Sequence, residues 1–159
     1  MPLTKLRTFL DNYNVPYVVI SHSVAYTAQG IAALAHIPGK ELAKTVIIKL
    51  DTELAMAVLP ASYLVDTVML RAAGARTVEI ATEREFKDRF PDCEVGAMPP
   101  FGNLYGMKVF VDTSLTKDKE IAFNAGSHRE LVRMAFDDFV RLVQPKILPF
   151  AAGRAISAA

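Results

Sequence analysis

The hydrophobic positions of this chain change their spacing several times, which predicts that helices and strands are mixed along it. At the N-terminus, Leu3, Leu6, Leu10 and Tyr13 recur at helical spacing. Because residues three and four apart share one face of a helix, this pattern predicts an amphipathic helix over 3–13. Later apolar runs are short and rich in β-branched residues, which is typical of strands.

Helical spacing and short β-branched runs also predict the secondary structure of most of the remaining chain. Strands are predicted over 15–21, 42–50, 54–60, 76–81, 107–112 and 120–126. Helices are predicted over 27–37, 62–74 and 82–90. The run 130–143 is predicted to form a strand in its first half and a helix in its second half.

The order of these segments indicates the fold class. The short turn "DTE" between 42–50 and 54–60 predicts a hairpin. Helices placed irregularly among strands favour an α+β, or mixed α/β, fold built around a substantial sheet. We expect one domain over 1–150 and a flexible tail over 151–159, where the residues are small.

Composition and charge restrict the possible functions. The chain has 159 residues, of which 52% are hydrophobic, so a packed globular domain is expected and disorder is excluded. The formal net charge is only +1, so any contact with nucleic acid must be local. The apolar runs are too short to span a bilayer, and the N-terminus lacks the apolar run of a signal peptide. We therefore expect a cytoplasmic protein without a membrane segment.

Known catalytic motifs are missing from the sequence. Cys93 is the single cysteine, and the histidines His22, His36 and His128 follow no metal-ligand spacing, so neither a metal nor a disulfide is expected. There is no phosphate loop and no nucleophile elbow. Cys93 is interpreted as a small buried hydrophobe. Chemistry would have to rest on positioned backbone amides and a lysine.

Two loops rich in glycine and proline are the first candidates for a site. They are "GAMPPFG" at 96–102 and "NAGSHRE" at 124–130. Glycine lets backbone N–H groups approach a ligand closely, so the amides of Ala125, Gly126 and Ser127 are candidates for stabilising an oxyanion. Phe101 and the prolines are expected to form a stiff apolar wall. The alternative is that these loops are purely structural.

Lys44 is the third candidate, because it is a cation inside an apolar strand. Leu42, Val46 and Ile48 have the parity of a buried face, and Lys44 shares that parity. We expect its side chain to point toward a pocket. The alternative is a lysine that extends its charged end to the surface.

The segments "SHSVAYTAQGIA", "LAKTVIIKL", "GAMPPFG" and "FNAGSH", in this order, resemble the YbaK/EbsC family. These proteins are free-standing relatives of the editing domain of bacterial prolyl-tRNA synthetases, and the resemblance covers about residues 15–145. It implies a curved, partly barrel-like sheet flanked by helices. It also implies hydrolysis of the ester between a wrong amino acid and its tRNA, in trans and without a metal or other cofactor.

The resemblance also implies roles for individual residues. Lys44 corresponds to the essential lysine of the family, and Gly126 to the glycine after the late strand. The expected substrate-binding residues lie around these two and along both loops: Tyr26, Thr45, Gly96, Met98, Pro99, Pro100, Phe101, Gly102, Asn124, Ala125, Ser127 and His128. His128 is interpreted as a hydrogen-bonding support rather than as a base.

The expected partner is the 3′ end of an aminoacyl-tRNA, with an aminoacyl-tRNA synthetase as a further partner. The expected substrate carries a small amino acid, alanine or serine before anything bulky, and the attacking oxygen comes from water or from a hydroxyl of the substrate. Two alternatives belong to other classes of protein. One is a non-catalytic module that binds tRNA ends or a synthetase, and the other is a nucleotide-binding regulatory domain.

Overall fold

The computed structural model describes residues 3–21 and 41–154. The helix predicted over 27–37 and the expected site residue Tyr26 lie outside the described residues. Within the described ranges, no helix is long and apolar enough to cross a membrane.

The larger sheet has five strands in the order β5-β2-β3-β6-β9. Its central β2–β3 hairpin confirms the hairpin predicted from the "DTE" turn. β6 runs parallel to β3, and β9 runs parallel to β6. The strands are β2 (Ala43–Leu50), β3 (Glu53–Pro60), β5 (Val78–Ile80), β6 (Lys108–Asp112) and β9 (Lys146–Leu148).

The second sheet has three antiparallel strands in the order β1-β8-β7. They are β1 (Tyr17–Ser21), β8 (Glu130–Ala135) and β7 (Glu120–Asn124). A parallel bridge between Leu42 and Ala122 brings the start of β2 against β7. The described strands therefore form a curved, mixed arrangement that does not close into a barrel.

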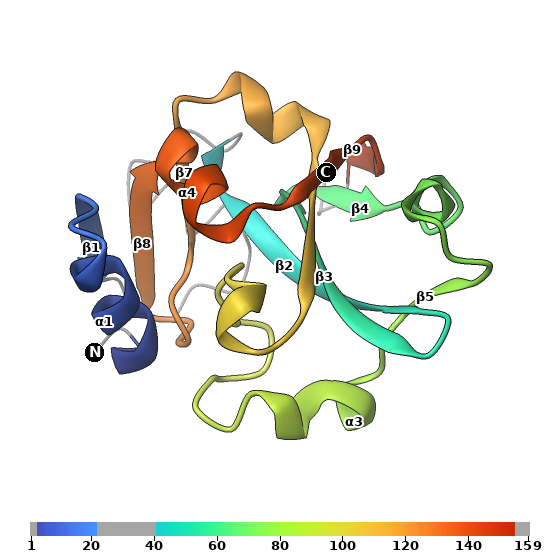
Figure 1. The fold of residues 1–159 in the computed structure, drawn as a ribbon, viewed down its shortest axis with the longest axis horizontal. Helices are drawn as coiled ribbons and strands as arrows, with labels where there is room; N and C mark the ends of the chain where they lie inside the picture. Colours follow the sequence, from blue (N-terminus) through green and yellow to red (C-terminus); the bar gives the residue numbers. More distant parts are fainter. Residues whose placement is uncertain (1–2, 22–40, 155–159) are drawn as a thin grey trace.

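Three α-helices lie around these sheets in the described part of the chain (Figure 1). They are α1 (Thr4–Asn12), α3 (Glu83–Phe86) and α4 (Phe136–Val143). α1 lies near β1 and β8, and α4 contacts β7 and β8. Thr82 and Glu85 form the capping box that starts α3. Short 3₁₀ helices cover Met69–Ala73, Lys87–Arg89, Gly102–Leu104 and Thr113–Lys117. The mixed α+β class predicted from the sequence is confirmed.

The core is divided between the two faces of the β2–β3 hairpin. Ile47 and Met56 belong to a large cluster that extends to α1, α4 and the second sheet. Ile48 and Ala55 point the opposite way, into a smaller cluster that includes Phe150. Because successive residues of a strand face opposite sides, the hairpin separates these two clusters.

The helix predicted over 62–74 is largely wrong. Tyr63–Val65 forms β4, and only Met69–Ala73 is helical, as one 3₁₀ segment. β4 pairs with β10 (Ala151–Arg154), a strand in what the sequence predicted to be a flexible tail. The sequence pattern is ambiguous here because the partner of β4 lies almost ninety residues later, and only tertiary pairing could select the strand.

Asp112, at the end of β6, holds the start of this C-terminal strand. Its buried carboxylate accepts hydrogen bonds from the backbone N–H groups of Phe150 and Ala151, both at 2.8 Å. It also accepts from the Ser114 N–H at 3.0 Å. Burial pushes the pKa of Asp112 upward, but the hydrogen bond from the Ser114 hydroxyl and these backbone hydrogen bonds outweigh it and hold the pKa below its usual range.

We predict that Asp112→Ala lowers the free energy of unfolding by about 2–4 kcal/mol, because three backbone donors lose a charged acceptor. Since the folded-state pKa is lowered, the contribution of Asp112 is fully present above the pKa of the unfolded chain. It is lost as the pH falls through the folded-state pKa. Urea unfolding at neutral pH and at successively lower pH measures both effects. Asp88→Ala, at an exposed position, is the control, and an equal loss in the two variants would contradict the anchoring role of Asp112.

Candidate active site

The two loops that the sequence singled out are joined by backbone hydrogen bonds. The Gly126 N–H donates to the Ala97 carbonyl at 2.8 Å, and the Glu94 N–H donates to the Gly126 carbonyl at 2.8 Å. The carboxylate of Glu94 also accepts from the His128 N–H at 2.9 Å. These contacts, and the hydrogen bond from Ser127, hold the pKa of Glu94 below its usual range. Glu94 was not predicted from the sequence, because one exposed carboxylate next to a loop carries no distinguishing pattern.

His128 is oriented by the loop that precedes Gly96. Its Nε2 lies 2.7 Å from the Val95 carbonyl oxygen. A carbonyl only accepts hydrogen bonds, so Nε2 carries the proton, and in the neutral ring Nδ1 is the nitrogen with a free lone pair. Gly96 has a φ of +85°, and a Cβ there would meet the imidazole at 3.4 Å. That distance is an ordinary contact, so glycine is favoured here by the positive φ rather than by a lack of space.

The backbone amides do not form the oxyanion site that the sequence predicted. The Gly126 N–H is committed to Ala97, and the Ala125 N–H donates to the Glu130 carbonyl at 3.0 Å. Among the described residues, Ser127 alone of these three has an N–H without a hydrogen-bond acceptor. The expectation that successive amides at 125–127 face a ligand is therefore wrong for the first two of them.

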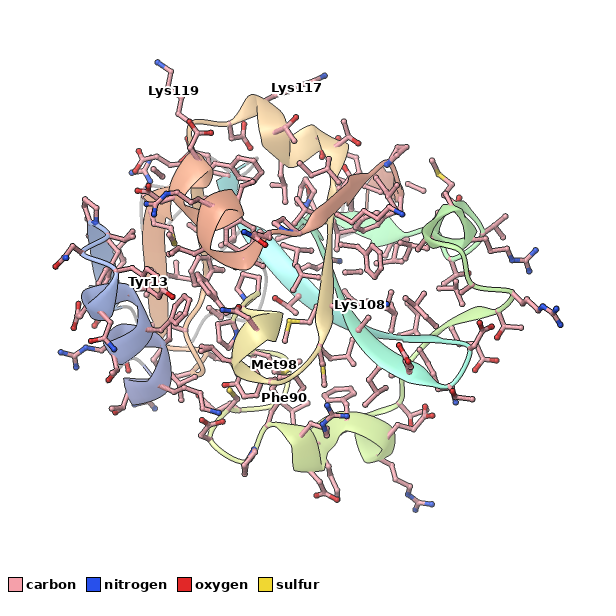
Figure 2. The ribbon with its side chains drawn as sticks, in the orientation of Figure 1. Tyr13, Phe90, Met98, Lys108, Lys117 and Lys119 are labelled. Carbon is pink, nitrogen blue, oxygen red and sulfur yellow. The ribbon has the colours of Figure 1, made fainter. Side chains whose placement is uncertain are left out.

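The second half of the glycine–proline loop packs inside the protein. Phe101 is 0% exposed and packs on Phe123 and Phe139 at ring-centroid distances of 5.5 Å. Met98 also belongs to this cluster, and Figure 2 shows it inside the molecule, whereas Lys117 and Lys119 project away from it. The expected pocket wall is thus part of the core.

The remaining members of this loop are buried as well. Pro99 and Pro100 are buried. A Cβ at Gly102 would collide with the Met107 carbonyl oxygen, so this glycine is required for close backbone packing. These residues are packed in the core beneath the loops. Because they are buried, the packing does not support their predicted contact with substrate.

Lys44 lies on the opposite face of β2 from that aromatic cluster. Its neighbours of the same parity, Val46 and Ile48, pack in the smaller core cluster, as expected. Its cross-strand partner is Leu59, which is 0% exposed. Lys44 itself is half-buried, and burial lowers the pKa of its ammonium group. Thr45 has the other parity, so its side chain points away from Lys44 toward the larger cluster.

The bridge between Leu42 and Ala122 brings the start of β2 against β7 and puts Lys44 and Asn124 on the same side of their strands. Residues two positions apart in a strand point to the same side. Lys44 and Asn124 both stand two positions after the bridge. Asn124 is also the last residue of β7, immediately before the loop that holds His128.

This surface, which we call the lysine face, consists of Leu42, Lys44, Ala122, Asn124, Leu131 and Arg133. The cross-strand register of β7 and β8 places the last four on one side of the second sheet. Arg133 bonds to Glu41 at 2.8 Å and lies 3.3 Å from Glu120. Two buried polar atoms without a hydrogen-bond partner, Asn124 Oδ1 and Arg133 Nε, both belong to this face.

Cys93 is not part of this surface. Its Sγ lies 3.3 Å from the Tyr105 hydroxyl, and burial raises the pKa of the thiol to about 11. The thiolate population at neutral pH is therefore very small. The described residues hold no group of three or more side chains that could ligate a metal.

A separate cleft of about 620 Å³ lies at the other end of β2. Its lining includes Lys49, Glu85, Arg89 and Lys108. Lys49 is paired with Glu85 at 2.6 Å. None of the residues predicted for the site lines this cleft.

The comparisons with known proteins agree with the observed fold. Residues 22–142 match the family model of the aminoacyl-tRNA editing domain, and the chain belongs to this family. A curated relative from Escherichia coli (strain K12) is the multifunctional Ser/Thr-tRNA deacylase ProXp-y. It is 25% identical over 152 residues, which are 92% of this chain and 90% of the relative. The same protein of Escherichia coli O157:H7 matches equally.

Solved structures share the fold. One, described as a candidate trans-editing enzyme for prolyl-tRNA synthetase, superimposes with a TM-score of 0.81 at 16% identity, covering 94% of this chain and 96% of that one. Another, the hypothetical protein APE2540, has a TM-score of 0.83 at 18% identity, with 93% and 99% coverage.

We predict that Gly126→Ala destabilises the protein instead of blocking a substrate. Gly126 has a φ of +91°, and a Cβ there would lie 3.1 Å from the Leu3 Cβ. Gly106 is the control, because its φ is +68° and a Cβ added there would have no atom within 4 Å. Backbone strain alone should cost Gly106→Ala about 1–2 kcal/mol, and Gly126→Ala should lose more. Urea unfolding of both variants measures the difference, and equal losses would exclude a role for the Leu3 contact.

Proposed function

We propose that this protein hydrolyses the ester bond of mischarged aminoacyl-tRNA, acting in trans on tRNA that a synthetase has released. Membership in the editing-domain family supports this function. The observation that carries it in the structure is the half-buried Lys44, which lies on the same face as Asn124, the last residue of β7 before the loop that holds His128. A cation removed from water is a strong electrostatic partner for the negative charge that develops on an ester oxygen.

The chemistry needs no protein nucleophile. An oxygen of water, or a hydroxyl of the substrate, attacks the carbonyl carbon of the ester. The bond from that carbon to the ribose oxygen then breaks, and the proton of the attacking group ends on the ribose oxygen. When water attacks, this step releases the free amino acid. When a substrate hydroxyl attacks, the acyl group moves to that hydroxyl, and a water molecule must cleave the new ester in a second step to complete hydrolysis. In this scheme Lys44 stabilises negative charge, and the Nδ1 lone pair of His128 accepts a hydrogen bond that orients the substrate.

A small amino acid is the proposed substrate, with serine ahead of alanine. The curated relative carries serine and threonine in its name. The proposed binding partner is the 3′ end of an aminoacyl-tRNA. The synthetase that produces the mischarged tRNA is a second proposed partner. The proposed compartment is the cytoplasm. A non-catalytic binding module would use the same face, but it would show no turnover.

We predict that Lys44→Ala reduces deacylation by about 10²–10³-fold, the usual effect of removing one preorganised electrostatic contact. Lys49→Ala is the matched control, because Lys49 lies on the same strand, faces the other side and is paired with Glu85. Single-turnover deacylation of seryl- and alanyl-tRNA measures the rates, and circular dichroism verifies the fold. Full activity in a folded Lys44→Ala protein would remove Lys44 from the mechanism.

We further predict that neither a chelator nor Cys93→Ser changes the deacylation rate by more than a few-fold. The thiol is held protonated by burial, and the described residues contain no metal-ligand cluster. The rate is compared before and after EDTA treatment and between wild type and Cys93→Ser. A large loss with EDTA that zinc restores would reveal a metal site.

A further inference from the structure

Asn124 has a feature that the hydrolytic scheme does not use. Its Oδ1 atom is buried and accepts no hydrogen bond. A buried acceptor without a donor is costly in a folded protein, because it has lost its hydrogen bonds to water. Such an atom is expected where a ligand supplies the missing donor.

The position of Asn124 indicates which ligand group that is. Lys44 shares the lysine face with Asn124, because each of the two residues lies two positions after the bridge that joins β2 to β7. The neighbouring side chains of that face nearest to Asn124, Leu131 and Ala122, are apolar and fully buried. The Asn124 amide is therefore a polar group among apolar neighbours, on the same face as the proposed catalytic cation.

We propose that Asn124 is a specificity residue whose side-chain amide hydrogen-bonds the side-chain hydroxyl of a seryl or threonyl group on the tRNA. This inference rests on the proposed function. A hydroxyl can donate to Oδ1, and it can equally accept from the amide NH₂ group if the amide is rotated by 180°, so recognition does not depend on the assignment of the two atoms. An alanyl group offers neither contact and leaves the amide without a partner.

Sites that hydrogen-bond a substrate hydroxyl reject analogues that lack it much more strongly than apolar pockets reject an extra methylene group. The cost of the unpartnered Asn124 acceptor also predicts how a substitution changes the stability of the fold. Replacing Asn124 by leucine, which has a similar volume, removes the unpartnered acceptor. The variant should be at least as stable as wild type.

The experiment compares wild type, Asn124→Leu and Asn124→Ala on one tRNA charged with serine, threonine or alanine. Asn103→Leu is the control, because Asn103 is an exposed asparagine at the start of a 3₁₀ segment that lies outside the lysine face. We expect Asn124→Leu to lower kcat/KM for seryl- and threonyl-tRNA by about 10- to 100-fold. The value for alanyl-tRNA should change less than threefold, and the melting temperature should not fall.

Equal losses for all three substrates would overturn the inference, because Asn124 would then contact a part that they share, such as the α-ammonium group or the adenosine. Unchanged seryl and threonyl values of kcat/KM would also overturn it.

Binding of 3′-seryl-amide and 3′-alanyl-amide analogues of adenosine, measured by calorimetry, separates this inference from the proposed hydrolysis. If wild type binds the seryl analogue more tightly, loses that preference in Asn124→Leu and yet hydrolyses nothing, the inference stands and the enzymatic proposal fails. If wild type binds the two analogues equally, the inference fails.

Discussion

The contact between the start of β2 and the middle of β7 determines the site. A single parallel bridge, Leu42 to Ala122, joins a strand of the five-stranded sheet to a strand of the three-stranded sheet. Because both strands have a two-residue period from this contact, it places Lys44 and Asn124 on the same face. The polar atoms of the lysine face come from strands that are about eighty residues apart in sequence. Their proximity depends on this register, since a shift by one residue would turn one side chain to the opposite face.

The loops contribute to the site chiefly by supporting it. The Glu94 carboxylate, the Val95 carbonyl and the Ala97 carbonyl each accept a hydrogen bond from the segment between Gly126 and His128. These bonds set the orientation of the imidazole and occupy the Gly126 N–H, which could otherwise have bound an oxyanion. A transition state in this protein would thus be stabilised mainly by side-chain charge, with the loops acting as a rigid frame.

The aromatic core explains why the glycine–proline loop is so stiff. Phe101 is enclosed by Phe123 and Phe139, and Gly102 allows the backbone to pass close to Met107. The alternation of β7 then separates the two regions, because Phe123 faces this core while Asn124 faces Lys44. Residues adjacent in sequence thereby serve the core and the site respectively.

The sequence by itself determined the helix of α1, the β2–β3 hairpin, the capping box of α3 and the parity of Lys44, because each depends on residues within a few positions of one another. It also indicated that the loops at 96–102 and 124–130 belong to one site. Tertiary structure alone decided that Tyr63–Val65 is a strand and that Phe101 is a core residue. It also placed Asn124 on the same face as Lys44 and selected Glu94 as the support of His128. These outcomes depend on pairing and packing between distant segments, and no local pattern of hydrophobic and polar residues specifies which distant segment will be the partner.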